Sequence, residues 1–124
     1  MKCRLYKYID YEDIKNWYES HGEKSPPRRF LPKNGYVVDG IAAGFLFRTD
    51  ADLALVEGFI SNKVANAKQK RSAFDMISHS LINRSKELGY DRVVAFSARK
   101  STKRLCLRFG FKYCGEYSCL VKGL

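Results

Sequence analysis

The stretch Leu53-Ala-Leu-Val-Glu-Gly-Phe-Ile-Ser-Asn-Lys-Val64 decides the fold, because it opens the one part of the chain that demands parallel strands. Its apolar and aromatic residues are typical of a long strand. An apolar pattern with helical spacing follows from Ser72 to about Leu88, and the segment from Arg92 to Ala98 is typical of a buried strand. A strand, a helix and a second strand in this order predict a parallel pair joined by a right-handed crossover.

The ends of this strand–helix–strand unit also have sequence signals. Ser72 could cap the helix, and Gly89 stands where helices commonly end. The segment from Asn66 to Arg71 is polar and basic, so we expect a loop there. Alternation along the first strand predicts one face with Glu57, Phe59, Ser61 and Lys63 and the other face with Val56, Gly58 and Ile60.

The rest of the chain favours hairpins and two more helices. Asp39-Gly40 is a strong tight-turn signal between the apolar runs Tyr36 to Asp39 and Ile41 to Arg48, so we expect a hairpin. Asp10 offers a cap to a helix that ends near Gly22. The remaining elements are predicted as a first strand, a proline-containing loop, a short helix that stops at Gly110 and two final strands: Cys3 to Ile9, Glu23 to Asn34, Ser101 to Phe109, Phe111 to Ser118, and Cys119 to Lys122.

Together these elements predict the α/β class, with a mixed, mostly antiparallel sheet, helices on both faces and a central parallel strand pair. The 124 residues fit a single domain that spans residues 1–124. No run approaches 18 apolar residues, so no membrane span is expected. The N-terminus lacks the apolar core of a signal peptide, so we expect a cytoplasmic protein.

Charge and cysteine content bear on the partners. The formal net charge of +10 predicts an anionic partner, such as nucleic acid, a phosphorylated cofactor or an acidic protein surface, although a basic surface can also serve solubility alone. The four cysteines form no CxxC pair, and only two histidines could join them, so we expect no metal site. The thiols are expected to be free, and most of them to be small core residues.

The element order resembles that of the GNAT superfamily of acyl-CoA-dependent N-acetyltransferases over nearly the whole chain. Three local matches carry the resemblance: the hairpin with Ala42-Ala-Gly-Phe45, the passage from the long strand into a helix at Lys68 to Ala73, and Leu105-Cys-Leu-Arg-Phe-Gly-Phe111 in place of the family's late helix. The resemblance implies an N-acetyltransferase that moves acetyl from acetyl-CoA to an amine by direct attack.

The resemblance places the pyrophosphate of acetyl-CoA at the start of the helix. The family pattern there is arginine or glutamine, two residues, glycine, one residue, and then glycine or alanine, and Lys68, Arg71 and Ala73 take the patterned positions. Backbone N–H groups at a helix N-terminus bind phosphates. Arg71 stands where glycine is usual, so either basic side chains hold the phosphates or the cradle has degenerated. The implied cofactor-binding residues here are Lys68, Gln69, Lys70, Arg71, Ser72 and Ala73.

Glu57 and Cys106 are the catalytic candidates. In the histone-modifying branch of the family, a glutamate base lies eleven residues before the first patterned position, as Glu57 does before Lys68. Such a base takes a proton from the substrate ammonium before the nitrogen attacks the thioester. Cys106 stands where many members carry a tyrosine that protonates the departing thiolate. Alternatively, Glu57 is a solvated or ion-paired strand residue and Cys106 only fills space.

The resemblance implies further contacts with the cofactor arm. The backbone near Ser61 and Lys63 would pair with the pantetheine in strand fashion. Ser101 or Thr102 could contact the arm, although both also suit a helix start. A different class of function also remains open: a GNAT-shaped binding or structural protein without turnover, which the missing loop glycines and the missing tyrosine favour. In a third alternative, the basic clusters and neighbouring aromatic residues bind nucleic acid.

Overall fold

The structure is a computed structural model that describes all 124 residues, and its five-stranded sheet follows the sequence order β1-β2-β3-β4-β5. The strands are β1 (Cys3–Leu5), β2 (Gly35–Val38), β3 (Ala42–Phe47), β4 (Leu53–Ser61) and β5 (Arg92–Val94). The helices are α1 (Tyr11–Ser20), α2 (Ala67–Glu87) and α3 (Lys100–Arg108), with short 3-10 turns η1 (Tyr8–Asp10) and η2 (Arg28–Phe30). β1 to β4 pair antiparallel, and β4 pairs parallel with β5. The predicted α/β class with a mixed, mostly antiparallel sheet is confirmed.

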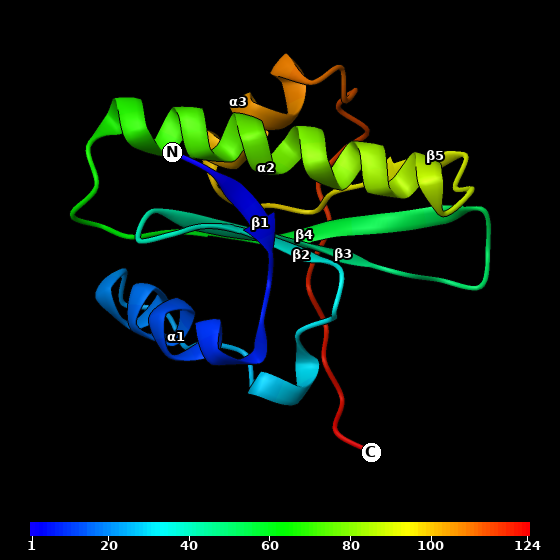
Figure 1. Cartoon of the computed structure of the whole chain (residues 1–124). Helices are drawn as coiled ribbons and strands as arrows, with labels where there is room; N and C mark the ends of the chain where they lie inside the picture. Colours follow the sequence, from blue (N-terminus) through cyan, green and yellow to red (C-terminus); the bar gives the residue numbers. More distant parts are fainter.

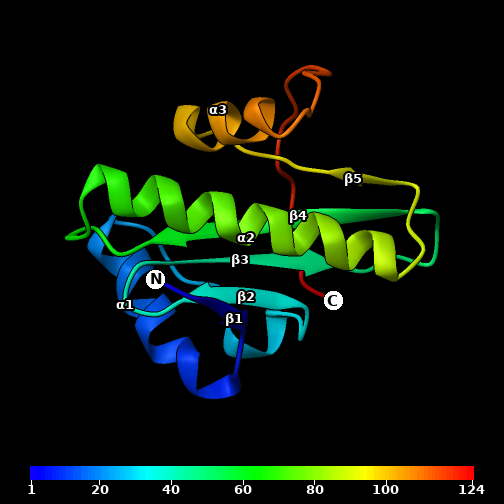
Figure 2. The ribbon, with the colours of Figure 1, turned by 45° about the horizontal axis from the view of Figure 1, so that its top comes forward.

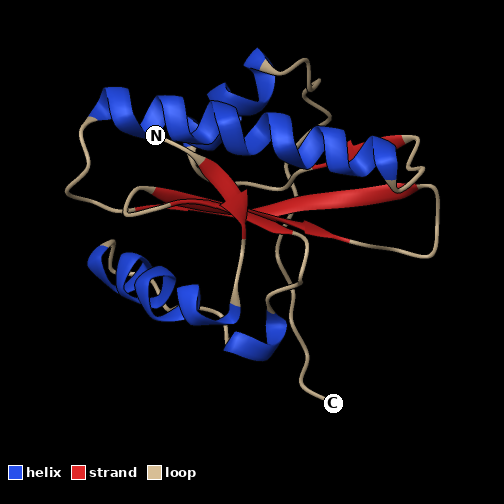
Figure 3. Ribbon diagram, viewed as in Figure 1, coloured by secondary structure: helices blue, strands red, loops and turns tan.

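Helices cover both faces of the sheet, as Figures 1 and 3 show. α2 and α3 lie on one side, and α1 lies on the other. α2 packs Ile77 and Leu81 into a buried cluster with Leu46 and Val56. α1 contributes Ile14 and Trp17 to a second cluster, with Phe45 and Ile60 among its other members. The sheet is therefore sandwiched between two separate apolar layers.

α2 begins at Ala67 rather than at Ser72, and its cap explains the difference. The Asn66 Oδ1 atom accepts the N–H of Gln69 at 2.8 Å, and the Gln69 Oε1 atom accepts the N–H of Asn66 at 3.1 Å. This reciprocal pair satisfies two donors that a helix start leaves free, so the helix can begin early. The loop predicted from Asn66 to Arg71 is wrong. Gly89 follows the helix with φ +85°, as predicted.

A bulge at Gly58 divides β4 into two parts. Glu57 lies opposite Phe45, but Ile60 lies opposite Ala43, so β4 has one residue more than β3 over this interval. Gly58 has φ +72°, a conformation that other residues rarely adopt. The bulge shifts the alternation, and the single face predicted for Val56, Gly58 and Ile60 is wrong. β4 also ends at Ser61, before the predicted Val64.

The C-terminal part contains fewer strands than the sequence predicts. β5 ends at Val94 instead of Ala98, and the two final strands from Phe111 to Ser118 and from Cys119 to Lys122 are absent. No backbone–backbone hydrogen bond involves a residue after Phe111, whose N–H donates to the carbonyl of Cys106. An alternating pattern forms a strand only beside a neighbour that supplies hydrogen-bond partners. The parallel pair therefore lies at the edge of the sheet rather than at its centre (Figure 2).

The other elements agree with the sequence to within a few residues. The hairpin turns at Gly40 with φ +73°, and Gly110 follows α3 with φ +86°. α1 and β1 start near their predicted positions but are shorter than predicted. All four cysteines are free, and Cys114 and Cys119 are exposed rather than in the core. None of the helices combines the length and apolar character that a membrane span requires.

Candidate functional site

The candidate site lies where β4 and β5 separate. The two strands pair from Leu53 opposite Arg92 to Leu55 opposite Val94, and the ladder then ends. Beyond it, the Glu57 Oε1 atom accepts the backbone N–H of Phe96 at 2.9 Å. A carboxylate thus bridges the two diverging chains immediately before the bulge. The space beside it is a cleft of about 230 Å³.

Polar side chains from four parts of the chain line this cleft. Tyr18 comes from α1, Glu57 from β4, and Glu23 from the loop after α1. Arg99 and Thr102 come from the start of α3. The guanidinium of Arg99 forms an ion pair with the carboxylate of Glu23. This pair joins the two sides of the sheet at the mouth of the cleft and leaves Glu57 as the carboxylate without a cationic partner.

Two ionisable side chains of the cleft have pKa values that differ from their values in water. Burial raises the pKa of Glu57, and the hydrogen bond from the Phe96 N–H opposes this shift. Burial also raises the pKa of Tyr18, with an opposing effect from Arg99 and a smaller raising effect from Glu57. A carboxylate with a raised pKa is a stronger base, and a phenol with a raised pKa keeps its proton at neutral pH. The cleft therefore combines a proton acceptor with a proton donor.

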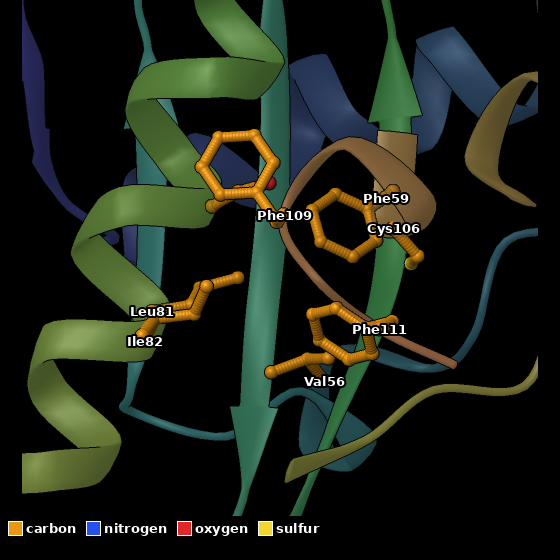
Figure 4. A pocket seen from close by; sticks show the side chains of 8 residues that line it. Val56, Phe59, Leu81, Ile82, Cys106, Phe109 and Phe111 are labelled. Carbon is orange, nitrogen blue, oxygen red and sulfur yellow. The ribbon is translucent and has the colours of Figure 1, made fainter. Parts of the chain in front are cut away.

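Cys106 lies in a separate, small apolar cavity between α2, α3 and β4 (Figure 4). The side chains around it include Phe59, Phe109 and Phe111. Burial raises the pKa of the Cys106 thiol, and the negative charge of Glu57 raises it further. The structure thus brings Cys106 within electrostatic reach of Glu57, but Cys106 is not among the residues that line the cleft.

The cofactor-binding residues predicted between Lys68 and Ala73 all lie inside α2. The N–H groups of Gln69 and Lys70 already donate to the Oδ1 and the carbonyl of Asn66. Ala73 is fully buried in the core, so its side chain faces the sheet rather than the surface. Lys68, Gln69, Arg71 and Ser72 are exposed. The start of α2 therefore offers cations to a phosphate, but not the open run of backbone N–H groups that glycines provide.

The other residues predicted to contact the cofactor arm lie in three different elements. Ser61 belongs to β4, and its carbonyl accepts a hydrogen bond from the His21 Nε2 atom at 2.9 Å. Lys63 lies in the turn after β4, so its predicted strand-like backbone is wrong. Its carbonyl accepts from the Lys70 Nζ atom at 3.2 Å. Ser101 is exposed in the first turn of α3, next to Thr102 of the cleft.

The sequence analysis missed Tyr18, Glu23 and Arg99 as residues of the site, whereas Thr102 was considered beside Ser101 as a contact of the cofactor arm. Tyr18 lies on the apolar face of α1 together with Ile14 and Trp17. Its position at the margin of that face was a signal, because a tyrosine there can bury its ring and present its hydroxyl. Glu23 and Arg99 lie far apart in the sequence, and only the tertiary structure brings them together.

Comparisons with known proteins support the fold. No family model and no curated protein sequence matches the chain. Among solved structures, Rv2747 from Mycobacterium tuberculosis in complex with CoA has a TM-score of 0.76 at 15% identity, over 93% of this chain and 74% of that one. Glucosamine-6-phosphate N-acetyltransferase from Arabidopsis thaliana has a TM-score of 0.65 at 13% identity, over 97% of each chain. An acetyltransferase from Trypanosoma brucei has a TM-score of 0.67 at 10% identity, over 98% and 99%. The resemblance to the GNAT fold is confirmed.

Proposed function

We propose that this chain is an acetyl-CoA-dependent N-acetyltransferase that acts on an amine. The observation that carries the proposal is the position of Glu57, a half-buried carboxylate in a cleft between diverging parallel strands. The fold is shared with acetyltransferases, one of which is described with CoA bound. Fold alone does not define a reaction, so the proposal depends on the residues of the cleft.

Glu57 and Tyr18 of the cleft have roles in this reaction. Glu57 takes a proton from the substrate ammonium, and the freed nitrogen attacks the carbonyl carbon of the thioester. The C–N bond forms, the nitrogen loses its second proton to water, and the C–S bond breaks with its electron pair leaving on sulfur. Tyr18 or Cys106 gives its proton to this thiolate. Cys106 is the weaker candidate, because it lies in the apolar cavity and not in the cleft.

Acetyl-CoA would be held differently from the family pattern. Lys68 and Arg71 would attract its phosphates through their side chains, aided by the N–H groups of the first residues of α2. The strand end at Ser61 and the start of α3 at Ser101 would contact the arm. The exposed cations at the start of α2 support this assignment.

The second candidate function is a GNAT-shaped binding protein without turnover. Two observations favour it: the start of α2 is already capped by its own residues, and Cys106 replaces the late tyrosine. A thermal titration with acetyl-CoA separates the candidates, since a ligand at 100 times its Kd stabilises a protein by about 2.7 kcal/mol. A melting temperature unchanged by millimolar acetyl-CoA would contradict the enzyme proposal.

The test of the mechanism is Glu57→Gln in an assay of acetyl transfer to a panel of amines. We expect kcat/KM to fall about 10²- to 10⁴-fold, because the amide cannot accept the proton. Glutamine keeps the oxygen that accepts the Phe96 N–H and removes a half-buried charge, so stability at pH 7 should not fall. The matched control is Glu116→Gln, which changes an exposed carboxylate of the C-terminal segment.

The pH profile gives an independent readout of Glu57. In the unaltered protein, kcat/KM should rise with pH as Glu57 loses its proton, with a midpoint above the ordinary glutamate value of about 4.3. This limb should be missing in Glu57→Gln. Equal activity of Glu57→Gln and the unaltered protein would refute the base assignment but not acetyl-CoA binding.

A further inference from the structure

The positive charge of the molecule is concentrated on one side of the sheet. The residues from Gly58 to Lys112 include 13 lysines and arginines against three acidic residues, Asp75, Glu87 and Asp91. In contrast, α1 on the other side carries Glu12, Asp13 and Glu19 against Lys15 alone. A charge that served only solubility would have no reason to be distributed in this way.

Exposed cations lie along both α2 and α3, and we call them together the basic face. Its members are exposed: Lys68, Arg71, Lys100, Lys103, Arg104 and Arg108. On α2, Lys68, Arg71 and Asp75 share one face at helical spacing, opposite the buried Ala73 and Ile77. Asp75 forms an ion pair with Arg108 of α3, so this acidic group is neutralised and joins the two helices. Both helices lie on the same side of the sheet (Figures 1 and 2).

One exposed aromatic residue lies beside the basic face, and a second lies against Phe96 of the cleft. The ring of Tyr113 is 58% exposed, and the Lys103 Nζ atom lies 4.2 Å from its centroid. The ring of Tyr117 is 70% exposed and stacks edge-on against Phe96, with 5.7 Å between centroids. Cations that follow a phosphate backbone together with rings that stack on bases are the combination that binds single strands.

We infer that the basic face binds single-stranded nucleic acid, with the phosphates on α2 and α3 and a base stacked on Tyr113. A phosphorylated cofactor at the start of α2 would occupy Lys68 and Arg71 but would leave the cations along α3 unexplained. This inference does not depend on acetyl transfer, and the same chain could do either without the other. Duplex DNA and anionic membranes compete as explanations of the charge, and they enter the test as alternatives.

The test compares two triple variants that change the net charge equally. Lys100→Glu/Lys103→Glu/Arg104→Glu alters the basic face at residues outside the proposed cofactor contacts. The control Lys2→Glu/Lys24→Glu/Lys33→Glu alters three exposed lysines elsewhere. Fluorescence anisotropy with a labelled 20-nucleotide oligodeoxythymidylate measures Kd at several salt concentrations. We expect the basic-face variant to bind at least tenfold more weakly, and its plot of log K against log salt to be shallower by about 2.

Tyr113→Ala tests the stacking. Its affinity for the oligodeoxythymidylate should fall about tenfold, and its affinity for a 20-base-pair duplex should not change. Circular dichroism melts establish that each variant is folded. If acetyl-CoA raises the melting temperature of a variant as much as that of the unaltered protein, the nucleic-acid surface is independent of the proposed cofactor site. The inference is overturned if the unaltered protein does not bind the oligonucleotide at 20 mM salt, or if both triple variants lose equal affinity. It is also overturned if Tyr113→Ala binds the single strand normally. Tighter binding of the duplex, or of vesicles containing phosphatidylserine, would overturn it as well.

Discussion

Two regions of this molecule are packed very differently, and Ser85 marks the boundary. Of the 22 buried residues, only Leu105 lies beyond Ser85. Both apolar clusters belong to the first region, whereas β5, α3 and the C-terminal segment carry exposed side chains such as Phe96, which is 50% exposed. The first region holds Glu57 in place, and the second supplies the opposite wall of the cleft. The first region thus provides most of the stability. The second region, which has few buried contacts, forms the opposite wall of the cleft and is expected to open more easily.

Replacing one phenylalanine by alanine in each region should give the largest difference in the free energy of unfolding. Phe45 is fully buried between α1 and the sheet, and Phe45→Ala should lower the free energy of unfolding by about 3–5 kcal/mol. Phe96→Ala removes an identical ring from the second region and should cost less than about 1 kcal/mol. Urea unfolding measures both. Equal losses would show that the second region is packed as tightly as the first.

The first region should also account for the loss of stability at low pH. The Asp10 carboxylate is buried and accepts hydrogen bonds from Arg4 at 2.7 Å and from the Lys7 N–H at 2.7 Å. These interactions, the Arg4 bond first, lower the pKa of Asp10 against the effect of its burial. Its stabilising effect is therefore complete above the unfolded-state value of about 3.9 and is lost as the pH falls toward the folded-state pKa.

We expect Asp10→Asn to lower the free energy of unfolding by about 2 kcal/mol at pH 7. The difference between variant and unaltered protein should shrink as the pH falls below about 4. Asp39→Asn is the control, because Asp39 binds the same Arg4 but is exposed to solvent, and little change is expected. A difference between Asp10→Asn and the unaltered protein that stayed constant down to pH 2 would contradict the ionic origin of the stabilisation.

Removal of the C-terminal segment should have the smallest effect. A chain that stops after Phe111 keeps the hydrogen bond to Cys106 and the ring that lines the apolar cavity. The residues removed make no backbone–backbone hydrogen bonds, so the melting temperature should change by no more than a few degrees. Amides of this segment should exchange with solvent fastest in the intact chain. Slow exchange there would show that the segment is held by partners.

Local signals in the sequence predict most of the scaffold. They are strong at positions where the backbone conformation requires one residue type, such as glycine. The turn at Asp39-Gly40 and the helix ends at Gly89 and Gly110 are examples. The bulge at Gly58 was missed, since a glycine inside a strand pattern is compatible with both a regular strand and a bulge. Asn66 and Ser72 are both good caps, and the choice depends on Gln69, which completes the reciprocal pair only with Asn66.

The site was predicted only in part, for a related reason. Glu57 was selected through the family resemblance, by its spacing before Lys68, and the structure puts it in the cleft. Tyr18, Glu23 and Arg99 become neighbours only through the packing of α1 and the crossover to α3. The pattern from Phe111 onward predicts strands, but it does not say whether a sheet edge accepts them.

The capped start of α2 has a consequence for the affinity of any phosphate ligand that would bind there. The Asn66 carboxamide would compete for the Gln69 N–H as a tethered group, at an effective concentration of about millimolar or more because its tether is short. A phosphate would have to displace this internal competitor, and its apparent affinity would be multiplied by the fraction of time that the cap is open. Replacement of Asn66 by glycine would remove the competitor, and phosphate compounds would then meet an open helix end.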